Sequence, residues 1–220
     1  MNNYDALASD LIKTTKYMFE NKLAWGNSGN ISARTSEDHF LITKSGTYLG
    51  ELTPEDFIEW EIGKEIDRSQ KDRPSKEVPM HQAIYERRPE INAVIHASPL
   101  YSTLAACTTM DIAANSFIEG MYYLERIERI PYAHPGSKEL GELVYEKANK
   151  TNIILLENHG VLVYDTSLQE AKMALHTLEF ACEMAILSEK SGLPIQNLPE
   201  HIVHDFLHHA GYKPKRNWEK

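Results

Sequence analysis

Residues 152–165 read NIILLENHGVLVYD, and they give the clearest indication of the fold. It contains two apolar runs, 152–158 and 160–165, which are joined at His159-Gly160. Short apolar runs rich in β-branched residues are typical of buried strands, and a glycine between two such runs allows the chain to turn sharply. The stretch therefore predicts two buried strands paired as a hairpin, with a histidine at the turn.

On either side of this hairpin, the apolar periodicity predicts further elements. Five more strands are expected, at 30–35, 39–43, 57–62, 91–96 and 127–133. Six helices are expected, at 4–22, 75–88, 99–107, 137–150, 167–190 and 199–209. Ser75 is a candidate N-cap, and Ser167 with Glu170 has the spacing of a capping box. His176 and Glu179, on the same long helix as that box, are interpreted as a solvated or interface pair.

Strands and helices are mixed along the chain, and several neighbouring strands are close enough for hairpins. We therefore expect an α/β fold in which a mixed, largely antiparallel sheet is covered by helices. The glycine patterns of dinucleotide-binding and P-loop folds do not occur in the sequence, which argues against a doubly wound nucleotide-binding fold. The 220 residues show no internal repeat, and we interpret them as a single domain, 1–220.

The bulk composition narrows the possible partners. The formal net charge is −9, which argues against binding to nucleic acid or to an anionic membrane, because both need a basic surface. Cys107 and Cys182 have no motif spacing, no apolar run approaches the ~18 residues of a membrane span, and the N-terminus lacks the features of a signal peptide. Cytoplasmic localisation is the resulting expectation.

Glycines and small polar residues cluster in three segments that could hold a phosphate: 26–30 (GNSGN), 43–46 (TKSG) and 74–77 (PSKE). Turns of this kind expose backbone N–H groups and hydroxyls. The third segment lies at the predicted start of a helix, whose free N–H groups attract anions. Each segment taken alone is also compatible with an ordinary loop or, for 74–77, with a capped surface helix that has an acidic first turn.

Two histidines lie at the ends of predicted buried strands, His96 after AVI and His159 after IILLEN. A buried strand that ends in histidine places an imidazole at the rim of the sheet. Together with Glu77, these residues could form a His₂Glu set for a divalent metal. A single histidine in such a position is more often a core or surface residue, so the prediction depends on all three residues being brought together.

The order of these motifs resembles the class II aldolase/adducin superfamily. The resemblance covers nearly the whole chain, through GNSGNIS at 26–32, ITKSG at 42–46, PSKEVPMH at 74–81, AVIH at 93–96, PYAHPGS at 131–137 and LLENHGV at 155–161. It implies a three-layer α/β fold and a homotetramer with active sites at the subunit interfaces. It also implies a zinc or similar divalent ion held by three histidines, with a glutamate nearby as the acid/base.

The resemblance assigns a role to each candidate residue. It implies that Glu77 is the catalytic acid/base, and that Glu77, His96 and His159 are the metal-ligand positions. A tyrosine near the C-terminus is implied to come from the neighbouring subunit, and Tyr212 is the nearest candidate. The phosphate is implied to bind at Asn27, Gly29, Asn30, Ser45, Gly46, Ser75 and Lys76.

The sequence departs from the family pattern at two positions. Where the family has His-x-His, this chain has His96-Ala97-Ser98, and serine is a poor metal ligand at neutral pH. A family tyrosine falls on Phe117, which cannot donate a proton. Three interpretations stay open: the remaining three ligands hold the metal together with water, His134 supplies a replacement ligand, or the site is metal-free.

The function implied by the resemblance is a divalent-metal-dependent, aldolase-type lyase that cleaves a fuculose-phosphate-like ketose phosphate through an enediolate. The metal stabilises the developing negative charge as a Lewis acid, and Glu77 moves the proton. The same chemistry supports a decarboxylase or an epimerase of a related sugar phosphate or sugar acid. A non-catalytic binding or oligomerisation scaffold is the third possibility, which an apolar or salt-bridged pocket at these residues would favour and a bound metal would oppose.

Overall fold

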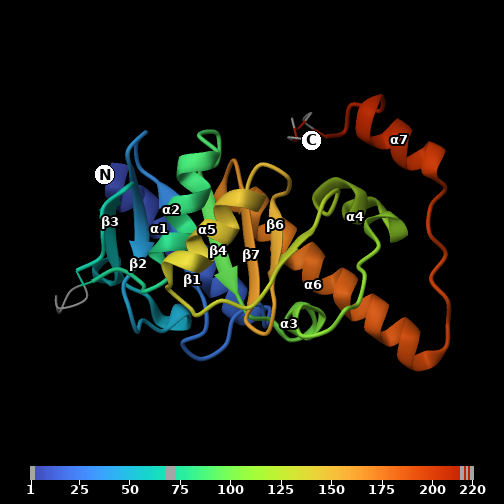
Figure 1. The fold of residues 1–220 in the computed structure, drawn as a ribbon, viewed down its shortest axis with the longest axis horizontal. Coiled ribbons are helices and arrows are strands. Elements are labelled where there is room, and N and C mark those ends of the chain that lie inside the picture. The colour runs from blue at the N-terminus through green and yellow to red at the C-terminus, as the bar shows by residue number, and fades with distance from the viewer. Residues whose placement is uncertain (1–2, 68–72, 214–215, 217, 219–220) are drawn as a thin grey trace.

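The computed structural model describes residues 3–67, 73–213, 216 and 218 (Figure 1). Within these residues seven strands form one sheet: β1 (Asn30–Arg34), β2 (His39–Thr43), β3 (Phe57–Glu61), β4 (Ala93–Ala97), β5 (Glu128–Ile130), β6 (Ile153–Leu156) and β7 (Gly160–Asp165). The α-helices in the same residues are α1 (Asn3–Glu20), α2 (Val78–Arg87), α3 (Leu100–Ala106), α4 (Ile118–Tyr123), α5 (Lys138–Lys147), α6 (Leu168–Ser191) and α7 (Glu200–His208). Short 3-10 helices lie in the connections, at η1 (Leu49–Glu51), η2 (Pro54–Asp56) and η3 (Ala114–Ser116). No helix in these ranges is long and apolar enough to cross a bilayer.

The strands are arranged in the order β3-β2-β1-β4-β7-β6-β5. Every neighbouring pair is antiparallel except β5 and β6, which run parallel. In the β6–β7 hairpin, Leu156 pairs with Gly160 and Ile153 pairs with Val163, so the pairing predicted for 152–165 is confirmed. The mixed, largely antiparallel sheet that the sequence predicts is confirmed as well.

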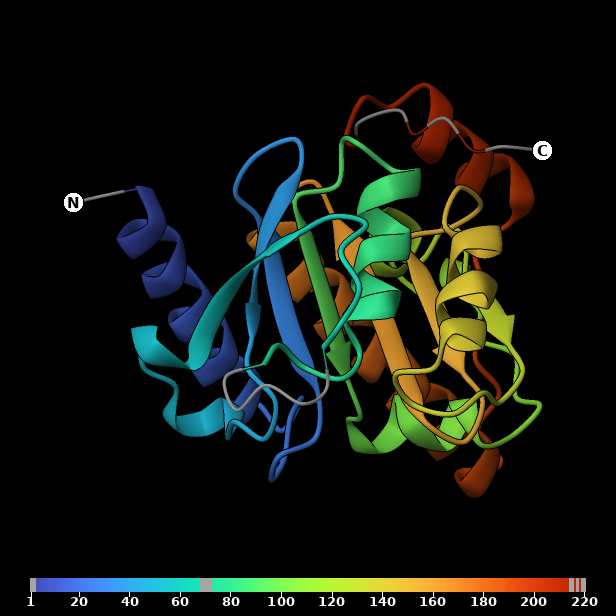
Figure 2. The same ribbon diagram turned by 60° about the vertical axis from the view of Figure 1, so that its left-hand side comes forward.

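The sheet separates two apolar layers, because successive side chains of a strand point to opposite faces. On β4, Ala93, Ile95 and Ala97 belong to the core cluster shared with α1, α3 and α6, whereas Val94 belongs to the cluster shared with α2 and α5. Figures 1 and 2 show α2 and α5 on one side of the sheet and α1 and α6 on the other. The molecule therefore has the three layers that the resemblance implies.

Two predicted boundaries are wrong for local reasons. The helix predicted to begin at Ser75 begins at Val78, with Glu77 in the N-cap position, and the Ser75 hydroxyl oxygen accepts a hydrogen bond from the Glu77 N–H at 3.3 Å. The strand predicted at 127–133 is reduced to the three residues of β5. Pro131 follows β5 directly, and a proline has no N–H to donate to a neighbouring strand.

Several chain segments converge at one end of the sheet. Asn30 at the start of β1 pairs with His96 near the end of β4, and His96 also pairs with Leu162 near the start of β7. Thr43 ends β2 at the same place, and its carbonyl oxygen accepts a hydrogen bond from the Ser75 N–H at 2.9 Å. The segment that leads into α2 is therefore held against this end of the sheet.

Candidate metal and phosphate site

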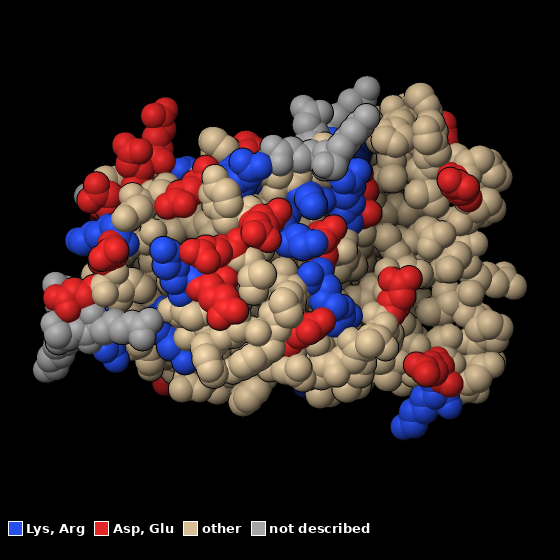
Figure 3. Space-filling view, in the orientation of Figure 1, with Lys and Arg blue, Asp and Glu red and all other residues tan. Residues whose placement is uncertain are grey.

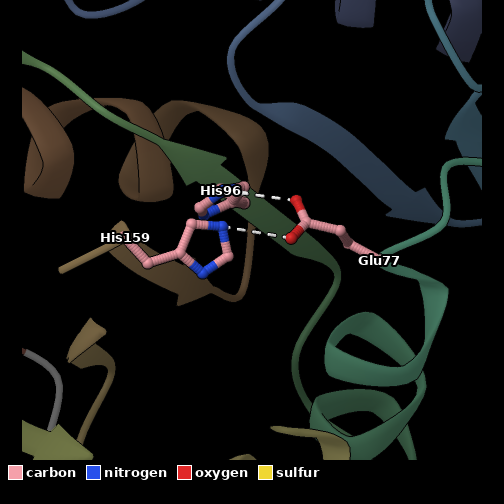
Figure 4. Close-up of side chains that lie close together, drawn as sticks. All are labelled: Glu77, His96 and His159. Atoms are coloured by element: carbon pink, nitrogen blue, oxygen red, sulfur yellow. Dashed lines mark ion pairs between the residues drawn. The ribbon is translucent and has the colours of Figure 1, made fainter. Parts of the chain in front are cut away.

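Three ionisable side chains from separate elements meet at this end of the sheet (Figure 4). Glu77 precedes α2, His96 lies on β4, and His159 lies in the turn between β6 and β7. His96 Nε2 is 3.3 Å from Glu77 Oε2, and His159 Nε2 is 3.2 Å from Glu77 Oε1. One possible ligand atom from each residue lies within 4.8 Å of the other two. The fold thus brings together the three residues that the sequence proposes as metal ligands.

The backbone of the β6–β7 turn determines where His159 is placed. Asn158 adopts a left-handed conformation with φ of 56°, and Gly160 has φ of 151°. A Cβ at position 160 would lie 2.5 Å from the Ala97 carbonyl oxygen and 2.7 Å from Ser98 Oγ, so a side chain there would collide with the end of β4. Because Gly160 permits this close approach, the turn holds His159 beside β4.

Hydrogen bonding and burial determine the protonation of the cluster. His96 Nδ1–H donates to the Val161 carbonyl oxygen at 3.0 Å, so Nε2 carries the lone pair that faces Glu77. Burial lowers the pKa of His96, although Glu77 opposes this, and the imidazole is neutral at neutral pH. Burial alone would raise the pKa of Glu77, but the close neighbours His96 and His159 outweigh it and hold that pKa well below its usual range.

This arrangement fits a bound cation better than an ion pair. An ionised carboxylate and the lone pair of a neutral imidazole face each other across 3.3 Å, and both are acceptors. Among the described residues, Glu77 Oε1 and His159 Nδ1 are buried without a hydrogen-bond partner. One carboxylate oxygen and two imidazole nitrogens are a donor set that zinc and related divalent ions accept. The residues present therefore fit a divalent metal.

Neither Ser98 nor His134 completes this set within the described chain. Ser98 Oγ donates to the His159 carbonyl oxygen at 3.1 Å, so the serine fastens the turn that carries His159. His134 Nδ1 is 3.1 Å from the Tyr132 hydroxyl, and His134 is not part of the group of possible ligands found there. The geometry favours the interpretation in which Glu77 and the two histidines are the protein's ligands.

The two glycine-containing turns adjoin the segments that carry these ligands. Gly29 packs against β4, since a Cβ on it would lie 2.6 Å from the His96 carbonyl oxygen. Ser45 N–H donates to the Arg73 carbonyl oxygen at 3.1 Å, which places its turn beside the segment that leads into α2. Gly46, in the same turn, has φ of 83° and open space where a Cβ would lie.

The other predicted phosphate residues differ in how open they are. Asn27 and Lys76 are exposed, as is Ser45, and exposed polar groups can reach a phosphate. Ser75 is buried, and its hydroxyl oxygen accepts from the Glu77 N–H. The role of these residues in phosphate binding stays a prediction.

A buried chain of hydrogen bonds behind Glu77 links the candidate residue Asn30 to three residues that had no role assigned from the sequence: His81, Ser32 and Tyr85. Asn30 Nδ2 is 2.8 Å from Glu77 Oε2, and Asn30 Oδ1 is 2.6 Å from His81 Nε2. Ser32 Oγ is 2.7 Å from His81 Nδ1 and 2.8 Å from the Tyr85 hydroxyl. A signal for this chain exists in the sequence, because Glu77, His81 and Tyr85 recur every four residues and so share one side of a helix.

Two aromatic positions implied by the resemblance lie in the C-terminal half of the chain. The ring of Phe117 packs against Phe180 of α6 with 5.5 Å between centroids. Tyr212 is 71% exposed, packs against Phe206 of α7, and lines a groove between α4 and α7. The lining of that groove does not include Glu77, so a catalytic role for Tyr212 in a neighbouring subunit stays a prediction.

Comparison with known proteins gives this geometry a family context. The model of the Class II Aldolase and Adducin N-terminal domain matches residues 9–186. The chain is 31% identical over 174 residues to a 3-oxo-tetronate 4-phosphate decarboxylase of Haemophilus influenzae, and the aligned region covers 77% of this chain and 81% of that protein. It is 35% identical over 164 residues to a 5-methylthioribulose-1-phosphate/5-deoxyribulose-1-phosphate aldolase of Escherichia coli, and the aligned region covers 74% of this chain and 76% of that protein.

The fold is shared as well as the sequence. The solved structure of an L-fuculose 1-phosphate aldolase superposes on this chain with a TM-score of 0.81 and 27% identity, covering 91% of this chain and 94% of that one. The family model spans most of the chain, including all three candidate metal ligands. This chain belongs to the class II aldolase and adducin family.

Proposed function

We propose that this protein is a divalent-metal-dependent, aldolase-type lyase that cleaves a ketose phosphate, of the fuculose phosphate type, through an enediolate. The observation that carries the proposal is the cluster of Glu77, His96 and His159, whose ligand atoms lie within 4.8 Å of one another. We propose zinc as the metal, because two imidazole nitrogens and a carboxylate oxygen suit it. When bound, the metal would act as a Lewis acid toward substrate oxygens and stabilise negative charge that develops on them.

Glu77 is proposed as the residue that moves the proton. Its Oε2 accepts the Asn30 Nδ2–H at 2.8 Å, whereas Oε1 has no hydrogen-bond partner among the described residues. The oxygen that takes the proton from the substrate is therefore Oε1, which has a lone pair to offer. The lowered pKa of Glu77 keeps the carboxylate ionised before the substrate arrives.

The phosphate of the substrate is proposed to bind at the turns beside the cluster. Ser45 and Lys76 are exposed and can offer a hydroxyl and an ammonium group, and the turns at Gly29 and Gly46 can offer backbone N–H groups. Holding the phosphate there fixes the reacting carbons relative to the acid/base. We further propose that the protein works in the cytoplasm as a homotetramer, with Tyr212 reaching the site of a neighbouring subunit.

Decarboxylation of a related sugar phosphate is the second candidate, and Phe117 is the observation that favours it. Aldol cleavage turns a substrate hydroxyl into the aldehyde carbonyl, so the hydroxyl proton must be taken up; a tyrosine at position 117 could serve in that transfer, and phenylalanine cannot. Loss of carbon dioxide reaches the same enediolate without forming an aldehyde. One relative is named for such a decarboxylation.

A non-catalytic scaffold is the least supported function. An ionised carboxylate buried among two imidazoles costs several kcal/mol unless it is compensated. A divalent ion bound by Glu77, His96 and His159 would supply this compensation, and a scaffold has no use for such an ion.

The proposal is tested by metal analysis and product analysis on the same protein. We expect about one divalent ion per chain by elemental analysis. Cleavage is followed by coupling the formation of dihydroxyacetone phosphate to NADH oxidation, and decarboxylation by the release of carbon dioxide. Glu77→Gln should lower kcat by roughly 10²- to 10⁴-fold, the usual contribution of a general acid/base. His159→Ala should lose the metal.

His134→Ala is the matched control, because it removes an imidazole that the described structure leaves outside the cluster. It should keep both metal and activity, and loss of metal in this variant would refute the three-ligand set. Carbon dioxide release without aldehyde would favour the second candidate. A wild-type protein that takes up no metal from excess Zn²⁺ would leave the scaffold as the leading function.

A further inference from the structure

We infer that His81, supported by Ser32 and Tyr85, is a positioning residue that orients the Asn30 amide and through it the Glu77 carboxylate. The inference rests on the proposed function in one respect, namely that Glu77 is the group that acts on the substrate. Its basis is the continuous chain of four hydrogen bonds that runs from Glu77 into the interior, between α2 and β1.

The placement of the five residues follows from the periods of their elements. Glu77, His81 and Tyr85 are spaced four residues apart, so they form one stripe along the side of α2 that faces the sheet. Asn30 and Ser32 are two residues apart on β1, so their side chains leave the sheet on the same face. None of the five is more than 5% exposed, and water therefore cannot replace the hydrogen bonds between them.

While Glu77 is ionised, the hydrogen bonds of this chain can run in only one donor-to-acceptor direction. The carboxylate can only accept, so Asn30 presents its Nδ2–H to Glu77 and its carbonyl oxygen to His81. His81 must then donate from Nε2–H, and its Nδ1 accepts from the Ser32 hydroxyl. The Ser32 oxygen in turn accepts from the Tyr85 hydroxyl. The reverse direction requires a protonated Glu77 and the other tautomer of His81.

Burial keeps the supporting groups uncharged. It lowers the pKa of His81 to about 3, with His96 adding to the shift and Glu77 opposing it. Burial also raises the pKa of Tyr85 above its usual value. His81 therefore carries a single ring proton at neutral pH, and the nitrogen that carries it reports the direction of the whole chain.

The hydrogen-bond chain holds the Glu77 carboxylate in place and does not conduct protons. A proton relay would have to pass through Asn30, and an amide does not take up and release protons at neutral pH. The amide can instead turn over, which exchanges Oδ1 and Nδ2 with little change in shape. A turned amide would set its oxygen against Glu77 Oε2, and two acceptors would then face each other. The Nε2–H of His81 prevents this, because it requires an acceptor on its side of Asn30.

The first test reads the proton on His81 directly. Two-bond proton–nitrogen correlation spectra of ¹⁵N-histidine-labelled protein show which ring nitrogen is protonated, and a His81→Phe sample identifies the His81 signals among the ten histidines. We expect the proton on Nε2. A proton on Nδ1 would overturn the inference. The measurement needs neither substrate nor turnover, so it remains decisive even when the proposed function fails.

The second test measures how the hydrogen-bond chain affects the two properties that depend on Glu77, namely Zn²⁺ affinity and kcat. His81→Phe keeps an aromatic ring and removes both hydrogen bonds of the imidazole. We expect Zn²⁺ binding, titrated by calorimetry against a competing chelator, to weaken by roughly 10- to 100-fold, because Asn30, the hydrogen-bond partner of the Glu77 carboxylate, is then no longer held in place. The kcat should fall by a similar factor. The KM for the sugar phosphate should change less than kcat, because Asn30 is the only predicted phosphate residue that belongs to the hydrogen-bond chain.

Tyr85→Phe and Tyr164→Phe form a matched pair that separates positioning from core stability. Both tyrosines are fully buried in the same core cluster, and each variant loses one hydroxyl hydrogen bond, which for Tyr164 goes to the Ala148 carbonyl oxygen at 3.2 Å. Tyr85→Phe should lower Zn²⁺ affinity and kcat, by less than His81→Phe, and Tyr164→Phe should leave both unchanged. This pair also decides the inference if His81→Phe does not fold.

Equal effects of the two tyrosine variants, or wild-type Zn²⁺ binding by a folded His81→Phe, would overturn the inference. If the wild type binds Zn²⁺ and the variants follow the expected order, but no sugar phosphate is cleaved or decarboxylated, the proposed function fails and the positioning role stands. If the wild type binds no Zn²⁺, the proposed function fails and the nuclear magnetic resonance measurement alone decides the inference.

Discussion

At the scale of single residues, the absence of one Cβ permits the His159 turn to form. Gly160 has φ of 151°, and a Cβ on it would lie 2.5 Å from the Ala97 carbonyl oxygen. On the same side, Ser98 Oγ donates to the His159 carbonyl oxygen and ties the turn to the end of β4. The position of one metal-ligand candidate therefore depends on a glycine and a serine that are not themselves ligands.

Gly160→Ala is expected to lower both stability and metal binding. The backbone conformation and the collision with Ala97 together should reduce the free energy of unfolding by about 3 kcal/mol or more. Urea denaturation measures this loss. Because relief of the collision moves the His159 turn away from β4, Zn²⁺ titration of the folded variant should show weaker binding than the wild type.

Gly63→Ala separates the collision from the backbone effect. Gly63 has φ of 85°, and no atom lies within 4 Å of where its Cβ would be. This variant should lose only about 1 kcal/mol, the cost of a left-handed conformation, and should bind Zn²⁺ as the wild type does. Equal losses in the two variants would show that the close approach at Gly160 is not what matters.

At the scale of elements, the long helix α6 holds the start of α3. Glu179 of α6 accepts hydrogen bonds from the Tyr101 and Ser102 N–H groups, both at 2.8 Å. These belong to the first turn of α3, where N–H groups have no partner in their own helix and a negative charge is stabilising. The interpretation of His176 and Glu179 as a solvated or interface pair is wrong, since His176 Nδ1 is 2.7 Å from the Tyr17 hydroxyl.

Glu179→Ala is expected to destabilise the protein through α3. Three hydrogen bonds to a charged acceptor are lost, two from the N–H groups at the start of α3 and one from the Ser102 hydroxyl, at about 1.5–3 kcal/mol each before relaxation, so the free energy of unfolding should fall by about 3 kcal/mol or more. Thermal or urea denaturation gives the value. Glu189→Ala, an exposed residue on the same helix, is the control and should change stability by less than about 0.5 kcal/mol. A comparable loss in the control would rule out the capping role.

At the scale of the whole molecule, two apolar grooves lie on different parts of the surface. One, of about 680 Å³, is lined by exposed side chains that include Trp25, Leu100 and Leu104. The other, of about 700 Å³, lies between α4 and α7 and includes Ile202 and Tyr212. Figure 3 shows few charged side chains on the side of the molecule formed by α4, α6 and α7. Two different patches that meet head to tail can close a ring of subunits.

The protein is expected to be a homotetramer of about 100 kDa, four times the 25.1 kDa of one chain. Light scattering after size exclusion measures the mass. A charge placed in either groove should dissociate the ring, because it cannot be desolvated in an apolar contact, so Leu104→Glu and Ile202→Glu should each lower the mass. Leu187→Glu is the control: Leu187 is 49% exposed, close to the 44% of Leu104, but lies in neither groove. A monomeric wild type would refute the ring.

Most elements of the fold could be predicted because their signals are local. The hairpin at 152–165 is confirmed, and the Ser167 hydroxyl accepts from the Glu170 N–H at the start of α6, which is one of the two bonds of the predicted capping box. The six-residue helix α4 was not predicted, since so short a helix shows too little periodicity. β5 is shorter than predicted because Pro131 has no N–H to donate to a neighbouring strand. The proline is visible in the sequence, but the apolar residues around it predict a longer strand.

Apolar periodicity in the sequence is enough to place Glu77, His96 and His159 each at an end of an element, because it marks where elements stop. Three features are visible only in the folded chain: these ends meet, Asn30 turns its amide to Glu77, and partners are chosen for Ser98, His81, His134 and Glu179. The physical reason is that these contacts depend on the pairing of β1 with β4 and on the packing of α2 and α6 against the sheet. Both are interactions between distant segments, and no local pattern specifies them.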